Sequence, residues 1–341
     1  MPGTSPLARR IKRHVIARPQ RFFAATSPGF EAACLKELIK RLPAIDQAGI
    51  TPGGVEFEGR LEDGFRANLN LHLPNRILMR ISTFKSTNFR QLEKKTDHLA
   101  WELYVRPGSR PKVHVATRHC RLRHSGAIAE RLTRIINERL SGFESEQHLL
   151  ETAKSHADIF VRGVDDHFSV SIDSSGDLLY RRGLKEHTGK APLRETLAAG
   201  ALLMAGYDGS EPLLDPLCGT GTFSLEGALM TKRIPAGWFR DFAFYRWPSF
   251  SEKRWMFIKR QAESGIMRLQ KPMIFASDAD GEALLVRGID AAKGRPASPR
   301  AILEPVATPA DPEGGRFWRL VGGSIHGRVI VVVGKAILTP L

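Results

Sequence analysis

The stretch "LLDPLCGTGTFSLEGALM" at residues 213–230 decides the fold of the second half of this chain. Two leucines lead into Asp215, and a short loop with Gly219 and Gly221 follows before a segment with helical spacing. Because glycine has no Cβ, it lets the backbone turn sharply and approach a ligand closely. The stretch therefore predicts a short buried strand, a tight turn, and a helix whose free N–H groups point at whatever the turn holds.

Strands and helices alternate on both sides of this turn. Residues 191–207 and 281–294 have helical spacing, and "KPMIFASDAD" at residues 271–280 reads as a strand that ends in acids. This rhythm is typical of a doubly wound α/β sheet, which binds ligands at the carboxyl ends of its strands. Asp278 is then placed to take two ribose hydroxyls, so the sequence indicates a nucleoside-containing cofactor.

The glycine pattern limits which cofactor can bind. A dinucleotide fingerprint, G-x-G-x-x-G, has a third glycine where this chain has Ser224, and the Gly-Lys-Ser/Thr of a P-loop is absent. A nicotinamide-dependent dehydrogenase is therefore a weak alternative. An ordinary strand–turn–helix without a ligand also stays open, because two glycines alone are a common pattern.

The first half of the chain has a different pattern. Residues 1–20 are basic and are expected to form a flexible tail. Alternating strands such as "GGVEFEG" at residues 53–59 mix with helices such as "SGAIAERLTRIINERL" at residues 125–140, where Ile128, Leu132 and Ile136 share one face. We therefore expect an α+β amino-terminal region.

The charge balance points to a polyanionic partner. The 341 residues hold 51 Lys and Arg against 36 Asp and Glu, a formal net charge of +15. Chains this basic attract nucleic acids, although a solvated surface with no partner is the alternative. One cluster at residues 118–134 supplies the candidate RNA-binding residues Arg118, Arg121, Arg123, Arg131 and Arg134.

Cysteine spacing and hydropathy bear on disulfides, metal sites and membrane spans. Cys34, Cys120 and Cys218 are widely spaced, which predicts no disulfide framework and no metal site, and fits a reducing cytoplasm. No apolar run approaches the ~20 residues that a membrane span needs. We expect a cytoplasmic protein without a membrane partner; the oligomeric state is not indicated.

The segment "DPLCGTGTFSLEGA" at residues 215–228 closely resembles motif I of a known family. That family is the class I S-adenosylmethionine-dependent RNA methyltransferases with an amino-terminal THUMP domain, in particular the bacterial large-subunit rRNA guanine-N2 group. Further strings resemble the family at residues 22–38, 53–59, 69–94, 124–132, 179–202, 242–250 and 274–280.

The resemblance implies a division of the chain. A ferredoxin-like segment would cover residues 21–63, a THUMP RNA-binding domain residues 64–178, and a Rossmann-like methyltransferase domain residues 185–341. The fold class would then be an α+β region followed by an α/β domain that is incomplete at its carboxyl end.

The resemblance also implies the site. S-adenosylmethionine would be bound by Asp215, Gly219, Thr220, Gly221, Thr222 and Asp278, and the methyl would go to a guanine N2 of 23S rRNA. Arg182, Lys190 and Arg194 precede motif I and would contact cofactor or RNA, or else form a solvated basic face. Cys218 reads as a small loop residue, Trp247 as a packing residue, and Asp311 as a candidate adenine-side acid.

The family's acceptor loop is missing. Enzymes of this type use an Asn/Asp-Pro-Pro-Tyr/Phe loop, whose polar groups orient the amine toward the methyl. These 341 residues contain no such tetrapeptide, so the catalytic residues stay unknown. "RVIVVVG" at residues 328–334 falls where the preceding strand belongs. A truncated or frameshifted enzyme, a non-catalytic RNA-binding protein and an unrecognised acceptor loop all remain open.

Overall fold

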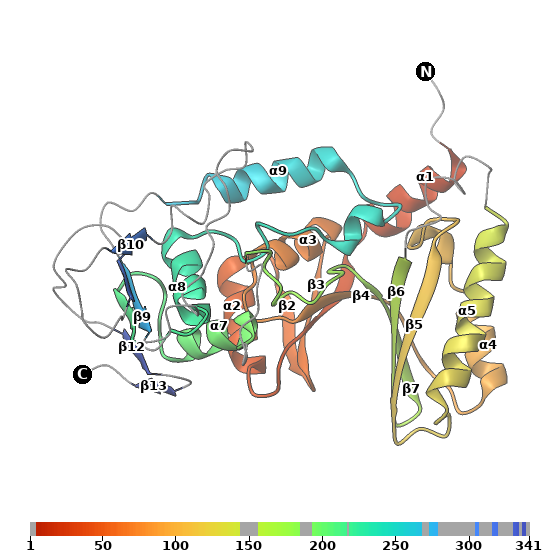
Figure 1. Ribbon diagram of the computed structural model, residues 1–341. Coiled ribbons are helices and arrows are strands. Elements are labelled where there is room, and N and C mark those ends of the chain that lie inside the picture. Colours follow the sequence, from red (N-terminus) through yellow and green to blue (C-terminus); the bar gives the residue numbers. More distant parts are fainter. Residues whose placement is uncertain are drawn as a thin grey trace.

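A computed structural model describes residues 5–143, 156–184, 193–216, 218–267 and 273–278, together with four short strands at 304–306, 316–319, 330–333 and 336–338. Within these residues the chain forms two sheets (Figure 1). The larger sheet lies in the middle and right of the view, and the smaller one lies at the left edge, beside the carboxyl terminus. Helices of both halves pack between the sheets.

The larger sheet has seven described strands in the order β2-β3-β1-β4-β7-β6-β5. Only β5 and β6 run parallel, and every other neighbouring pair is antiparallel. The strands are β1 (Gln20–Ala25), β2 (Gln47–Thr51), β3 (Gly54–Gly59), β4 (Arg76–Lys85), β5 (Arg110–Arg118), β6 (His156–Val164) and β7 (His167–Asp173). This half therefore has the mixed α+β architecture that its sequence pattern predicts.

Helices cover this sheet where the apolar spacing predicts them. They are α2 (Glu31–Arg41), α3 (Leu61–Asn70), α4 (Phe89–Asp97), the 3₁₀ turn η2 (Trp101–Leu103) and α5 (Ser125–Ser141). The predicted apolar face of α5 is confirmed, because Ile128, Leu132 and Ile136 are all buried. The predicted boundary after residue 63 falls inside α3, and the sheet continues past it through β4. The sheet therefore shows no break at that position.

The described part of the predicted tail, residues 5–20, is not a flexible tail. Residues 6–16 form α1 (Pro6–Ile11) and a π-helical turn η1 (Lys12–Ile16), whose Ile11 and Val15 are buried. Arg10 also pairs at 2.8 Å with Glu102, whose side chain is fully buried. The prediction was wrong here because the two apolar residues, four apart, share one buried helical face, while Arg9, Lys12 and Arg13 stay exposed.

The smaller sheet is Rossmann-like at its centre. Its described strands follow the order β10-β11-β9-β8-β12-β13, and β9, β8 and β12 run parallel. They are β8 (Leu213–Asp215), β9 (Ile274–Asp278), β10 (Glu304–Val306), β11 (Arg316–Arg319), β12 (Ile330–Val333) and β13 (Ala336–Leu338). The strand predicted at residues 328–334 is confirmed as β12, beside β8.

The outer strands depart from an all-parallel sheet. β13 is antiparallel to β12, and β11 is antiparallel to β9. Only two residues separate β12 from β13, and a link that short can close a hairpin but cannot make the crossover that parallel strands need. The sheet is therefore mixed, with a parallel centre.

Helix α8 packs closely on the centre of this sheet. The described helices of this half are α7 (Glu195–Met204), α8 (Thr222–Lys232), the 3₁₀ turn η3 (Ala243–Arg246) and α9 (Glu252–Glu263). A Cβ on Gly227 of α8 would lie 2.5 Å from Leu213 Cδ2, so glycine allows this approach. The third glycine of the dinucleotide fingerprint, which allows close packing of helix on strand, is replaced here by Ser224. Gly227, one helical turn later, allows the same close packing.

An aromatic cluster joins the two halves. Phe244 stacks on Phe65 of α3 with ring centroids 4.1 Å apart, and Phe242 and Trp255 pack in turn against Phe244. Trp247 is 4% exposed and contacts the same Phe65 ring. Its predicted packing role is confirmed. No helix among the described residues has the length and apolar character of a membrane span.

We expect Val15→Ala to lower the free energy of unfolding by about 2 kcal/mol, because it leaves a cavity in the core. Arg9→Ala is the matched control in the same segment, because Arg9 is exposed and its loss should cost less than about 0.5 kcal/mol. Urea unfolding followed by circular dichroism measures both. If the two variants are equally stable, Val15 is not packed in the core, and the prediction of a flexible tail would be right after all.

Candidate cofactor turn and basic cavity

The turn between β8 and α8 has the geometry that the sequence predicts. Asp215 ends β8 and is 1% exposed, and Ser224 Oγ donates to its Oδ2 at 2.7 Å. Gly219 and Gly221 have φ values of +53° and +70°, a backbone conformation that residues other than glycine rarely adopt. The carboxylate and the two glycines therefore fix a sharp turn directly before the helix.

Helix α8 begins at the end of this turn. Gly221 is its N-cap residue and, within the described residues, no side chain caps the helix. Thr222 is buried in its first turn, and Thr220 lines a cavity. The cavity therefore reaches the residue that lies two positions before α8, close in sequence to the end of a helix that favours anionic groups.

The turn lies at the carboxyl edge of parallel strands. Asp215 is the register partner of Ala276 in β9, and Asp278 ends β9 two residues later. The backbone thus brings Asp278 to the same edge as the turn. This is the edge at which open α/β sheets bind ligands.

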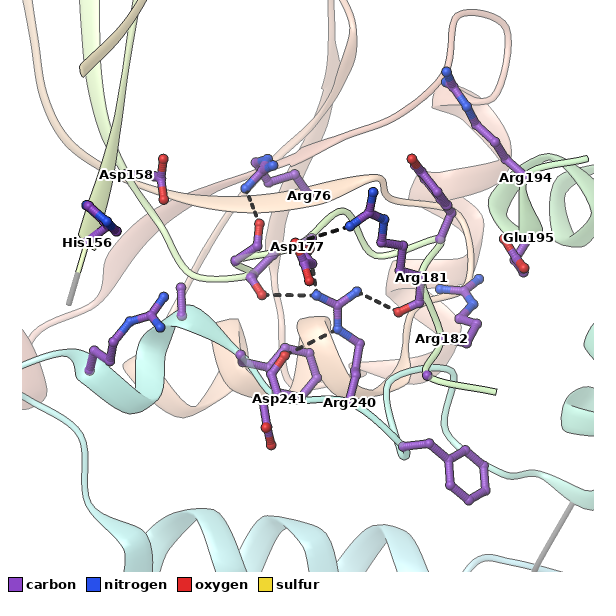
Figure 2. A pocket seen from close by; sticks show the side chains of 18 of the residues that line it. Arg76, His156, Asp158, Asp177, Arg181, Arg182, Arg194, Glu195, Arg240 and Asp241 are labelled. Carbon is purple, nitrogen blue, oxygen red and sulfur yellow. Dashed lines mark hydrogen bonds and ion pairs between the residues drawn. The ribbon is translucent and has the colours of Figure 1, made fainter. Parts of the chain in front are cut away.

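The cavity has a volume of about 1320 Å³ and extends from Thr220 to strands β5 and β6. Figure 2 shows His156 and Asp158 on one side, Arg194 and Glu195 on the other, and Arg240 between them. Cations outnumber carboxylates in its lining, which includes Arg76, Lys112, Arg181, Arg182, Arg194, Arg240 and Arg246 against Asp158, Asp177, Glu195 and Asp241. Both halves of the chain therefore contribute to one basic space.

Arg240 organises the loop that follows β7. Its guanidinium donates to the carbonyls of Asp177 at 2.6 Å, Leu178 at 2.7 Å, Arg181 at 3.1 Å and Ser175 at 3.2 Å (Figure 2). Burial lowers the pKa of Arg240 to about 10, which still leaves the side chain charged at neutral pH. One cation thus fixes a loop that forms a wall of the cavity.

A buried ion-pair network ties α8 to the amino-terminal half. Glu226 accepts from Arg182 Nε at 2.9 Å and contacts His72 Nδ1 at 2.9 Å, and all three side chains are at most 2% exposed. Arg182 Nη2 also donates to the His72 carbonyl at 2.7 Å. Glu37 of α2 accepts from the backbone N–H groups of His72 and Leu73. The network fixes α8, and with it the turn.

The protonation states follow from this geometry. Burial lowers the pKa of His72, which stays neutral and donates its Nδ1–H to Glu226. Burial raises the pKa of Glu226, but the interactions with Arg182 and His72 together lower it by a larger amount. The pKa of Glu226 therefore lies below its ordinary value. The contact between Glu226, Arg182 and His72 therefore holds one carboxylate, one guanidinium and one neutral imidazole.

The residues before motif I lie in different environments. Arg182 was expected to contact cofactor or RNA, or to be solvated; it is buried against Glu226 and not solvated, and it is among the residues that line the cavity. Arg194 lines the cavity, with its guanidinium 5.5 Å from the centre of the Tyr180 ring. Lys190 and Asp311 lie outside the described residues.

The five predicted RNA-binding arginines fall into two groups. Arg118, Arg121 and Arg123 are exposed at the junction between β5 and α5, where Arg121 pairs with Asp166 at 3.4 Å. Arg131 and Arg134 lie on α5 and pair with Glu93 of α4. None of the five is among the described residues that line the cavity. Their role in RNA binding stays a prediction.

Sequence reasoning missed Glu226 and Arg240. Glu226 had a detectable signal, because it is the only charged residue within "FSLEGALM" at residues 223–230. A carboxylate on a buried helix requires a partner. Arg240 had no such signal, because its partners are carbonyls of a loop some 60 residues earlier. Among the described residues, no group of three or more His, Cys, Asp or Glu side chains could hold a metal.

Two family models match the chain. Residues 182–293 match the RMKL-like methyltransferase domain, and residues 21–78 match the RlmL ferredoxin-like domain. The second match extends beyond the predicted end at residue 63 and includes the start of β4. Both matches agree with the two halves of the fold.

Curated relatives agree with these matches. A Synechocystis protein named "Putative RNA methyltransferase slr0064" is 30% identical over 285 residues, covering 83% of this chain and 72% of that protein. The ribosomal RNA large subunit methyltransferase K/L of Methylococcus capsulatus is 31% identical over 274 residues. That match covers 77% of this chain and 36% of the relative. This chain therefore spans about a third of the K/L protein.

Solved structures have the same fold. A "predicted N6-adenine-specific DNA methylase" from Listeria monocytogenes superposes with a TM-score of 0.70 and 27% identity, covering 78% of this chain and 70% of that one. SMU.472, described as "a putative methyltransferase complexed with SAH", gives a TM-score of 0.67 and 26% identity over the same shares.

The fold and the glycine turn define a class I methyltransferase domain behind a ferredoxin-like region. The 30% identity to the Synechocystis relative, of which 72% is covered, agrees with this fold and this turn. The chain belongs to the RMKL-like family of methyltransferases.

The buried His72 predicts an acid-sensitive fold. Its pKa is lowered in the folded state, so the unfolded chain takes up the proton first as the pH falls. Stability is complete above the unfolded pKa of about 6.5 and falls below it by at most about 1.4 kcal/mol per pH unit. Urea unfolding at pH 7.5 and 5.5 should show about 1 kcal/mol more loss for the parent protein than for His72→Gln. Equal losses would contradict a buried neutral histidine.

Proposed function

We propose that this chain is an S-adenosylmethionine-dependent RNA methyltransferase of the K/L type. The observation that carries the proposal is the glycine turn at the carboxyl edge of β8, because it opens into a basic cavity shared by both halves of the chain. A cofactor at the turn and a polyanion in the cavity would meet at Thr220. Membership of the RMKL-like family supports the reaction class.

The turn fits the proposed cofactor. An added Cβ on Gly219 would find no heavy atom within 4 Å among the described residues, so the turn leaves open space on that side. Asp215, Gly219, Thr220, Gly221 and Thr222 would hold the methionine and ribose portions, with Asp278 at the ribose. When bound, the cofactor supplies a methyl group on a sulfonium. The role of the turn is to orient that methyl toward the cavity.

The proposed acceptor is a guanine N2 of large-subunit rRNA. The names of the K/L relatives and the net charge of +15 support an RNA substrate. The cations of the cavity would bind phosphates near the turn. We also propose a cytoplasmic location, where ribosomal RNA and reduced cysteines coexist.

A second candidate function is non-catalytic RNA binding. It is favoured by the absence of the Asn/Asp-Pro-Pro-Tyr/Phe tetrapeptide from these 341 residues. Without that loop, no residue of this sequence is assigned to accept the hydrogen bonds of the guanine amine. A protein of this kind would retain the cofactor turn and the basic cavity without transferring the methyl.

Cofactor binding tests the turn directly. We expect S-adenosylhomocysteine to bind the full chain in isothermal titration calorimetry, and Asp215→Ala to weaken that binding at least about tenfold, because the carboxylate fixes the turn. Glu263→Ala on the exposed end of α9 is the matched carboxylate control and should bind as the parent does. If Asp215→Ala binds as tightly as the parent, the ligand is not held at the turn.

Methyl transfer distinguishes the two candidate functions. Tritium from labelled S-adenosylmethionine should enter unmodified 23S rRNA if the chain is a catalyst, and nucleoside digestion should place it on guanine N2. Cofactor binding without transfer favours the non-catalytic protein. Transfer to another base would overturn the guanine assignment while leaving the cofactor turn intact.

A further inference from the structure

We propose that the open face of β5 and β6 is a stacking platform for one unpaired base of a single-stranded RNA. This proposal rests on the proposed function and adds a second contact to it. One nucleotide would lie at Thr220, and a neighbouring part of the same strand would stack on His114. Four features of the described residues carry the proposal.

The first feature is the asymmetry of the sheet. Ile159, Val161, Val170 and Ile172 are register neighbours on one face of β6 and β7, and all four are buried. The residues between them on β6 point to the opposite face, because strand side chains alternate. That second face includes Asp158 and Phe160, both of which line the cavity. It is a polar face interrupted by an aromatic ring.

The second feature is a column of stacked planes on this face. Phe160 of β6 and His114 of β5 are register partners, with ring centroids 4.7 Å apart and planes 15° apart. The Arg76 guanidinium lies 5.0 Å from the Phe160 ring centre. Arg76 is itself fixed by Asp173 and by the Gly176 carbonyl. The column therefore runs from Arg76 through Phe160 to His114.

The third feature is the exposed end of the column. His114 lies on β5, which is the edge strand of the sheet among the described residues, and 37% of its side chain is exposed. Asp158 Oδ1 lies 2.7 Å from His114 Nε2 and holds the ring in its orientation. A flat, oriented and accessible ring at the end of a stack is a surface on which a base can continue the column.

The fourth feature is the continuity of the cavity. Thr220, His114 and Phe160 line the same space of about 1320 Å³, which exceeds the usual pocket for one small ligand. Lys112 shares the face of His114 one pleat earlier, and Arg246, from the segment that follows α8, lines the same cavity. These cations suit a phosphate backbone that runs between the turn and the platform. A base inside a duplex could not stack in this way, because its stacked neighbours already cover both of its faces.

The experiment is RNA binding by the full chain, measured by fluorescence anisotropy with a labelled single-stranded oligoribonucleotide. We expect His114→Ala to weaken binding at least about fivefold, the usual loss for one stacked base. Phe160→Leu should do the same by removing the support of the His114 ring. His98→Ala and Phe143→Leu are matched controls, because both side chains are exposed and lie outside the cavity lining and outside the basic cluster at residues 118–134.

Salt dependence separates stacking from charge. The slope of log affinity against log salt should be unchanged in His114→Ala and should fall by about one in Lys112→Ala. An RNA duplex of the same length should compete at least about tenfold less well than the single strand. Equal competition by the duplex would overturn the stacking claim.

Other outcomes are equally decisive. The proposal is overturned if His114→Ala and Phe160→Leu bind RNA as the controls do. If Phe160→Leu unfolds, His114→Ala still tests the platform, because His114 is partly exposed. Binding of S-adenosylhomocysteine should be the same in all these variants. If that ligand fails to bind the parent chain while the platform variants lose RNA, the cofactor proposal fails and the platform stands.

Discussion

The buried contact between Glu226, Arg182 and His72 is the interaction on which the site depends. Glu226 belongs to the helix that follows the glycine turn, His72 belongs to the amino-terminal half, and Arg182 lies in the segment between them. Removing one partner of a buried pair leaves an uncompensated charge and costs about 3–5 kcal/mol. A helix held in this way cannot shift without breaking charged hydrogen bonds. The turn in front of it is therefore positioned by the amino-terminal half as well as by its own sheet.

The same constraint makes the cavity a composite of both halves. One wall comes from β5 and β6, another from the loop after β7 that Arg240 fixes through four backbone carbonyls, and the turn contributes Thr220. The aromatic contact between Phe65 and Phe244 joins the halves a second time. A polyanion that enters this space meets cations from both halves, and it lies beside the turn without any further domain movement being required.

Much of the second half could be predicted because its signals are local. The strand, turn and helix around Asp215, and the strand that became β12, follow from runs of apolar residues and from glycines at set positions. The predicted tail failed for the opposite reason. Ile11 and Val15 carry too weak a local pattern to show that they are buried, and Arg10 gives no sign of its partner Glu102, 92 positions later. The antiparallel outer strands were also missed, since strand direction depends on the connections and not on composition.

The sequence alone determined the class of fold, the glycine turn, the basic charge and the family resemblance, because each of these is written in residues close together in the chain. Only the tertiary structure decided that Arg182 is a buried partner of Glu226, and that Gly227 takes the packing role expected at position 224. Only the tertiary structure brought His114, Phe160 and Thr220 to one cavity. These arrangements involve residues up to 106 positions apart in the sequence. Their energies depend on burial and on mutual geometry, and neither is present in a linear pattern.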